Sequence, residues 1–159
     1  MYYAMPRLFN LVAVDPGASG GICCVDPAGE ITLYPMPESL PDIYKLLTSI
    51  RYKDSAMWIE EVPRFAGKNI PSSSTSVLFQ NVGRIEGIAF AIGYSLHRVA
   101  PTVWQAPLGL GGRKSCENQN EWKRKLKAKA EELFPRVEGI TLKTADALLI
   151  AHFGMGGGR

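Results

Sequence analysis

The chain has 159 residues, enough for one domain with a sizeable hydrophobic core. Its composition, 46% hydrophobic and 21% charged, is typical of a globular protein and argues against intrinsic disorder. The net charge of +3 permits a nucleic-acid partner but does not require one.

The cysteines and the terminal segments indicate the setting in which the chain works. Cys23 and Cys24 are adjacent and Cys116 stands alone, a pattern that suits neither a disulfide framework nor a zinc site. We find no signal peptide and no apolar run of the length that spans a bilayer. We therefore expect an intracellular protein without a membrane partner, in the cytoplasm or nucleoid, an organelle stroma or a phage-infected cell.

The first half of the chain predicts a mixed sheet. Three apolar segments bounded by turn residues, 8–14, 21–25 and 30–34, predict a meander of three strands. Apolar residues at helical spacing predict a helix over residues 39–50, and residues 56–62 predict a fourth strand. This order is typical of a mixed sheet covered by helices.

The second half adds helices and one more strand. Residues 66–76 are polar and rich in glycine, proline and serine, which predicts a loop. The elements expected after it are a helix over 77–93, a strand over 94–99, and helices over 121–134 and 144–153. We expect a single domain over residues 1–159, with flexible ends at 1–7 and 155–159.

Asp15 stands where the first apolar segment ends, before Pro16 and Gly17. A carboxylate at the end of a buried strand is partly desolvated, which is costly unless a cation such as a metal ion meets it. The glycines that follow let the backbone turn and let a ligand approach closely. Asp15 is therefore the first candidate for a functional acid.

Glu60 and Glu61 close the fourth predicted strand. Successive strand residues point to opposite faces of a sheet, so only one of the two can share a face with a given ligand. We expect one of the two to be functional and the other to be solvated, with Glu60 as the candidate. Alternatively, both are edge charges that discourage strand pairing, and the strand rule does not decide between these interpretations.

Asp146 opens the last predicted helix, and its neighbours at i+3, i+4 and i+7 are apolar. An acid on a buried stripe needs a partner. Asp146 also suits the first turn of a helix, near the positive end of the dipole, with Thr144 as the N-cap. Both interpretations can hold together, because a helix N-terminus can aim a side chain at a site.

The three acids have the chemistry that a magnesium-dependent phosphodiesterase needs. Hard divalent cations prefer oxygen ligands and keep several waters. Two such cations can activate a water and stabilise the leaving oxygen of an in-line displacement. None of the acids is specific alone, but together Asp15, Glu60 and Asp146 predict one metal site.

A basic segment covers residues 113–129, which contain seven lysines and arginines but only two glutamates. Five of these cations belong to the helix predicted over 121–134, whose remaining stripe is apolar. Such a charge run is usually a solvated face. Its nearness to the flexible glycines Gly111 and Gly112 favours contact with phosphates of a DNA strand.

Four segments in this order resemble those of RuvC-type Holliday junction resolvases, over roughly residues 8–154. They are VAVDPG at 12–17, IEEV at 59–62, LFQNVGRIEGIA at 78–89 and ADALLIA at 145–151. The last segment, together with VAPTVW at 99–104, is most similar to phage-borne and chloroplast members of that group.

This resemblance implies an RNase H-like fold, a mixed five-stranded sheet flanked by helices, and a homodimer that nicks four-way DNA junctions symmetrically. It implies Mg²⁺, for which Mn²⁺ can substitute, bound by Asp15, Glu60 and Asp146. Gly83 and Gly87 let another backbone approach the helix that carries them, which fits packing on the sheet or a dimer contact.

Two positions depart from the family pattern. RuvC-type enzymes usually carry an acid or a histidine three residues before the final Asp, where this chain has Lys143. A charged lysine cannot ligate a metal ion, so we expect Lys143 to act at the scissile phosphate. The aromatic wedge after the catalytic Glu is displaced to Phe65. The residues expected to contact DNA are Arg64, Phe65, Lys68, Arg84, Arg113, Lys114, Lys123 and Lys127.

The expected function is structure-selective endonuclease activity that resolves four-way junctions in recombination, repair or phage DNA processing. Two alternatives stay open: an RNase H-like nuclease on other branched DNA or RNA–DNA hybrids, and a junction-binding module with a weakened site, for which Lys143 is the main argument. A phosphotransferase of the actin and sugar-kinase kind needs two such domains to close on ATP, and this chain has room for one.

Overall fold

A computed structural model of the chain describes residues 10–62 and 72–157. Its five strands are β1 (Leu11–Asp15), β2 (Gly21–Val25), β3 (Ile31–Pro35), β4 (Ala56–Glu60) and β5 (Ser95–Val99). They form one sheet in the order β3-β2-β1-β4-β5. The pairs β1–β2 and β2–β3 are antiparallel, whereas β1–β4 and β4–β5 are parallel, so the predicted mixed five-stranded sheet is confirmed.

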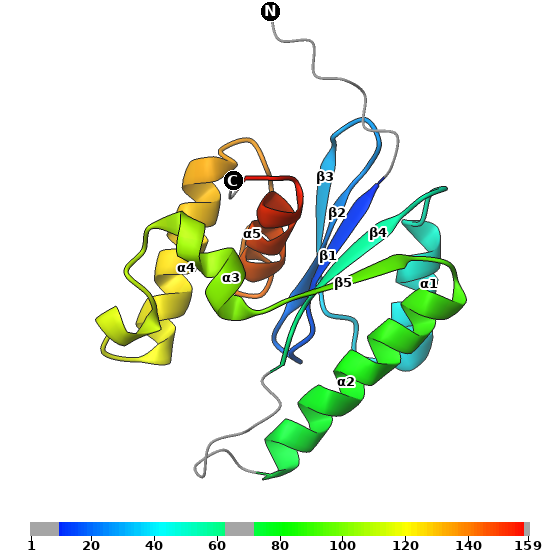
Figure 1. Ribbon diagram of the computed structural model, residues 1–159, viewed down its shortest axis with the longest axis horizontal. Coiled ribbons are helices and arrows are strands. Elements are labelled where there is room, and N and C mark those ends of the chain that lie inside the picture. Colours follow the sequence, from blue (N-terminus) through cyan, green and yellow to red (C-terminus); the bar gives the residue numbers. More distant parts are fainter. Residues whose placement is uncertain (1–9, 63–71, 158–159) are drawn as a thin grey trace, which may run out of the picture.

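Helices cover both faces of this sheet. They are α1 (Leu40–Ser49), α2 (Ser72–Ala91), α3 (Pro101–Gln105), α4 (Gln119–Leu133) and α5 (Ala145–Gly154), with short 3-10 helices η1 (Ala106–Leu108) and η2 (Arg113–Ser115). Figure 1 shows α1 and α2 on one face, and α3, α4 and α5 on the other. No helix in the described part of the chain has the length and apolar character that crossing a membrane requires.

Alternate strand residues point into two separate cores. Val12, Val14 and Ile59 pack in the core beneath α1 and α2, whereas Ala13 packs in the core with α4 and α5. Side chains two residues apart on a strand share a face. Asp15 therefore belongs to the α5 face, and Glu60 joins it because Trp58, two residues earlier, packs against the same core.

Two helix starts are fixed by side-chain caps. The Ser39 hydroxyl accepts a hydrogen bond from the Asp42 N–H at 3.3 Å before α1. The Asn118 side chain accepts one from the Glu121 N–H at 2.9 Å, and Glu121 in return accepts from the Glu117 N–H at 2.8 Å. This reciprocal arrangement sets the first turn of α4, and with it the direction of the basic residues that follow.

Several element boundaries differ from the prediction. Helix α2 begins at Ser72, so residues 72–76 of the predicted loop are helical, because helix propensity is a weak guide where a longer helix can continue. Strand β4 ends at Glu60, two residues early. Helix α3 is too short to leave a periodic signal in the sequence. The expected strand start at residues 8–9 and the expected flexible end at 1–7 lie outside the described residues.

Candidate active site

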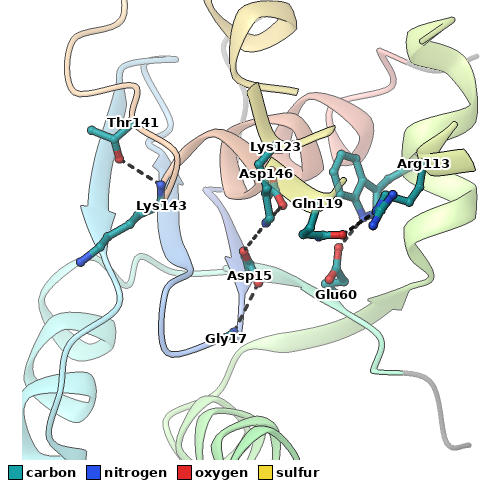
Figure 2. Close-up of polar contacts among 10 residues, drawn as sticks. Asp15, Gly17, Glu60, Arg113, Gln119, Lys123, Thr141, Lys143 and Asp146 are labelled. Atoms are coloured by element: carbon teal, nitrogen blue, oxygen red, sulfur yellow. Dashed lines mark hydrogen bonds and ion pairs between the residues drawn. The ribbon is translucent and has the colours of Figure 1, made fainter. Parts of the chain in front are cut away.

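Asp15, Glu60 and Asp146 meet at one end of the sheet (Figure 2). Asp15 and Glu60 end the parallel neighbours β1 and β4, whose carboxyl ends lie at the same edge. Asp146 is the second residue of α5, which packs against β1. The structure thus brings together the three acids that the sequence singled out.

Asp15 is buried at the end of β1, with 8% of its surface exposed. Its Oδ1 accepts a hydrogen bond from the Gly17 N–H at 3.3 Å. A β-carbon added at Gly20 would lie only 2.8 Å from Asp15 Cγ. The turn after β1 can therefore close over this carboxylate only because residue 20 lacks a side chain.

Asp146 is held against the sheet by a close backbone contact. A β-carbon at Gly21 would lie 2.7 Å from the carbonyl oxygen of Lys143 and 2.8 Å from that of Tyr34. The turn that leads into α5 thus rests directly on β2. Asp146 is 4% exposed, and its Oδ1 is buried without a hydrogen-bond partner among the described residues.

Thr144 occupies the N-cap position of α5 but does not cap it with its side chain, contrary to our expectation. Its hydroxyl donates a hydrogen bond to the Gly139 carbonyl at 2.8 Å and accepts one from the Thr141 N–H at 2.9 Å. The side chain of Thr144 is therefore engaged with the preceding turn, and Asp146 in the first turn of α5 contacts Lys123.

Lys123 extends from α4 to the carboxylates of Asp15 and Asp146. Its Nζ forms an ion pair with Asp146 Oδ2 and lies 3.7 Å from Asp15 Oδ2. The adjacent Trp122 and the next turn's Leu126 are buried in the core, which turns Lys123 toward the sheet. The structure therefore places Lys123 at the carboxylates, whereas the sequence grouped it with the DNA-facing surface of α4.

Glu60 is largely buried and accepts a hydrogen bond at Oε2 from Trp104 Nε1 at 2.9 Å. Burial, and then the neighbouring Asp15 carboxylate, raise the pKa of Glu60 to about 7, although the Trp104 hydrogen bond opposes the change. We did not assign Trp104 a role from the sequence. The sequence offers only a general indication for this residue, namely that a buried tryptophan N–H usually donates a hydrogen bond to some acceptor.

The pKa values of two other charged groups at the site, Asp146 and Lys123, are also shifted. Burial raises the pKa of Asp146, and the Lys123 ammonium opposes that rise. Burial works against the charge of Lys123, but the Asp146 and Asp15 carboxylates outweigh it and raise the pKa of Lys123. Buried acids whose pKa values are perturbed by specific partners are typical of functional sites.

The oxygen donors suit a hard divalent cation, but in their present arrangement a lysine stands among them. Among residues 10–62 and 72–157, no three acidic, histidine or cysteine side chains form a ready-made metal site. Two observations nonetheless fit a cation: the Asp146 Oδ1 is buried without a partner there, and the Lys123 ammonium already stands between two carboxylates. Asp15, Glu60 and Asp146 are therefore the residues that would hold a metal.

Lys143 points away from the three carboxylates, and Glu61 lies beside Arg98. Lys143 is exposed, its N–H donates to Thr141 Oγ1 at 3.2 Å, and its side chain points away from the carboxylates (Figure 2). Helix α5 begins only at Ala145, so Lys143 precedes the helix and does not share a helical face with Asp146. Glu61 lines a cavity of about 230 Å³ beside Arg98, a residue of the strand face toward α2.

The predicted DNA-binding residues that the structure describes lie on η2, α4 and α2. Arg113 and Lys114 line a groove of about 500 Å³ between α3 and η2, and Arg113 Nε donates to Gln119 Oε1 at 2.6 Å. Lys127 forms an ion pair with Glu131 on α4. Arg84 is exposed on α2, on the other side of the sheet. The expected contacts Arg64, Phe65 and Lys68 lie outside the described residues.

The fold is similar to that of two solved RuvC structures. T. thermophilus RuvC in complex with a Holliday junction substrate matches with a TM-score of 0.60 and 17% identity, over 95% of this chain and 98% of that chain. A second Thermus thermophilus RuvC structure matches with a TM-score of 0.56 and 17% identity, over 94% and 97%. No family model and no curated protein matches the sequence. The predicted resemblance and the RNase H-like fold are thus confirmed at the level of structure.

Proposed function

We propose that the chain is a metal-dependent DNA endonuclease that resolves four-way junctions. The observation that carries this proposal is the convergence of Asp15, Glu60 and Asp146 at the carboxyl edge of β1 and β4, in a chain with the RuvC fold. One of the similar RuvC structures holds a Holliday junction substrate, which supports this class of DNA as the partner.

The acids would hold Mg²⁺, for which Mn²⁺ can substitute, and bound there the cation would activate a water and stabilise the leaving oxygen. Asp15 and Asp146 supply buried carboxylate oxygens from opposite sides of the site. Burial and Asp15 raise the pKa of Glu60 to about 7 in the metal-free chain, and its carboxylate would serve as a third ligand of the cation. Trp104 fixes the Glu60 carboxylate by its hydrogen bond.

DNA would lie across the carboxylates and the loop before α4. Arg113 and Lys114, at the groove beside α3, would contact phosphates without reading bases, because flexible cations position a duplex but carry no sequence information. Lys127 would extend this surface along α4. We keep Arg64, Phe65, Lys68 and Arg84 as proposed contacts on the other arm of a junction, and Lys143 as a second phosphate contact.

Symmetric cleavage needs two sites, and α2 offers a surface for pairing two copies. Phe79, Gly83, Gly87 and Phe90 follow one exposed stripe of this helix, and Phe90 is 77% exposed. A β-carbon at either glycine would meet nothing within 4 Å. Phe90→Glu should therefore shift the chain from dimer to monomer in sedimentation velocity, whereas Leu40→Glu, on the exposed start of α1, should not.

The direct test is cleavage of labelled four-way, three-way, flap, duplex and RNA–DNA hybrid substrates with magnesium. The chain should cut the four-way junction at paired positions and leave linear duplex intact. Asp15→Asn and Asp146→Asn should abolish cleavage yet still bind the junction. Asp54→Asn is the matched control, because Asp54 is an exposed acid at positive φ, which asparagine tolerates.

A junction-binding module with a weakened site is the second candidate, and Lys123 favours it by standing among the carboxylates. Tight junction binding without cleavage in Mg²⁺ or Mn²⁺ would support this candidate over the nuclease. Cleavage confined to hybrids or to other branched DNA would instead assign the chain to a different RNase H-like activity.

A further inference from the structure

Lys123 has an environment unlike that of its neighbours on α4. Its Nζ pairs with Asp146 Oδ2 and lies 3.7 Å from Asp15 Oδ2, and 30% of its side chain is exposed. Lys125 and Lys127 instead pair with glutamates of their own helix, one turn away. Lys123 therefore joins α4 to two acids that belong to β1 and α5.

This contact has a clear electrostatic reason. Asp15 and Asp146 are both buried, and two buried carboxylates at one site repel each other. A buried charge is tolerated when an opposite charge and hydrogen bonds compensate it. In the chain without a metal, the Lys123 ammonium supplies that compensation. Within residues 10–62 and 72–157, Lys123 is the cationic residue that pairs with Asp15 and with Asp146.

A divalent cation and this ammonium cannot share the position. A Mg²⁺ ion bound to Asp15 and Asp146 stands about 2.1 Å from each ligand oxygen. The ammonium occupies the space between the same two carboxylates, so the ion would meet it at contact distance and repel it. The side chain can leave without any change in α4, because a lysine has a flexible four-carbon stem.

We propose that Lys123 is an internal counter-ion that occupies the metal position in the metal-free chain and is expelled when a divalent cation binds Asp15 and Asp146. The inference rests on the metal site of the proposed function and adds its regulation. Expulsion places a free ammonium at the mouth of the site, where the phosphate of a DNA strand would lie. Cation entry and phosphate capture are thereby coupled through one side chain.

The first experiment measures the exposure of Lys123 in the wild-type chain. Lysines are acetylated with an N-hydroxysuccinimide ester in EDTA or in saturating Mg²⁺, and each site is quantified by peptide mass spectrometry. Acetylation of Lys123 should become severalfold faster with Mg²⁺, whereas Lys125, which pairs with Glu121 on the same helix, should keep its rate. An unchanged Lys123 rate at saturating Mg²⁺ would overturn the proposal.

The second experiment measures metal affinity by Mn²⁺ electron paramagnetic resonance, without any DNA. Lys123→Met should bind Mn²⁺ about tenfold or more tightly than wild type, because apparent affinity falls with the fraction of molecules whose site is open. Lys125→Met controls for the loss of one positive charge. Equal or weaker binding by Lys123→Met than by Lys125→Met would overturn the proposal, and so would no binding by any form.

These readouts separate the inference from the proposed function. If Mn²⁺ binds and displaces Lys123 but no DNA is cut, the nuclease proposal fails while the displacement stands. If junctions are cut while Lys123 acetylation is insensitive to metal, the displacement fails while the nuclease stands. The acetylation experiment needs no variant, so it decides the matter even where Lys123→Met does not fold.

Discussion

Replacing Glu60 by glutamine should stabilise the metal-free chain at alkaline pH. The pKa of Glu60 is raised from 4.5 to about 7, chiefly by burial and by Asp15. The folded chain therefore holds this proton more tightly than the unfolded chain, and folding gains from Glu60 in its protonated form. That contribution is complete below about pH 4.5 and is lost as the pH rises through about 7.

The size of the effect follows from the pKa change. Each pKa unit corresponds to about 1.4 kcal/mol, so the rise from 4.5 to about 7 amounts to about 3 kcal/mol of unfolding free energy at most. Glutamine has no such titration and retains an oxygen that can accept from Trp104 Nε1. Glu60→Gln should thus be more stable than wild type by up to about 3 kcal/mol at pH 8 and nearly equal to it at pH 5.

Urea unfolding in EDTA at pH 5 and pH 8 measures this difference. Glu61→Gln is the matched control, since Glu61 is the adjacent glutamate and interacts with the Arg98 guanidinium. Saturating Mg²⁺ should favour wild type at pH 8, because the variant lacks one anionic ligand. A Glu60→Gln chain less stable than wild type at pH 8 in EDTA would refute the reasoning.

Three further predictions concern the site and the cleavage reaction. Trp104→Phe removes the hydrogen bond that lowers the pKa of Glu60, so in EDTA the pH at which the Glu60 contribution to the unfolding free energy is lost should rise; an unmoved pH in a folded variant would contradict this role. Lys114→Ala should reduce the slope of log affinity against log salt by about one, whereas unchanged affinity and slope would mean that Lys114 is only solvated. Lys143→Ala should lower the single-turnover rate less than Lys123→Ala at saturating Mg²⁺, and the reverse order would show that Lys143 turns inward on bound DNA.

The sheet and the acids were accessible from the sequence because each depends on local pattern. Asp15 follows an apolar segment, Glu60 and Glu61 stand near the end of the strand predicted over 56–62, and an acid at the start of an apolar helix marks Asp146. Two strands that run parallel bring their carboxyl ends together without further information. The three candidate acids can therefore be identified from the sequence alone.

The direction of the lysines was not accessible in the same way. Lys123 faces the acids because α4 docks beside α5, and this docking is a tertiary contact that the local sequence pattern does not give. Lys143 faces outward because α5 starts two residues after it. Spacing in the sequence gives relative position only within a helix, so it could not show that Lys123 reaches the acids.

The close approach of Gly21 to the backbone of Lys143 and Thr144, which leaves no room for a β-carbon, would bear on the ion selectivity of the proposed metal site. Main-chain atoms meet there with no side chain between them, so the separation of α5 from β2 has little freedom to adjust. Mg²⁺ requires short, near-octahedral ligand distances, whereas the larger Ca²⁺ accepts longer and more irregular ones. If Asp15 and Asp146 hold the cation, a spacing set by backbone against backbone would favour Mg²⁺ over the larger Ca²⁺.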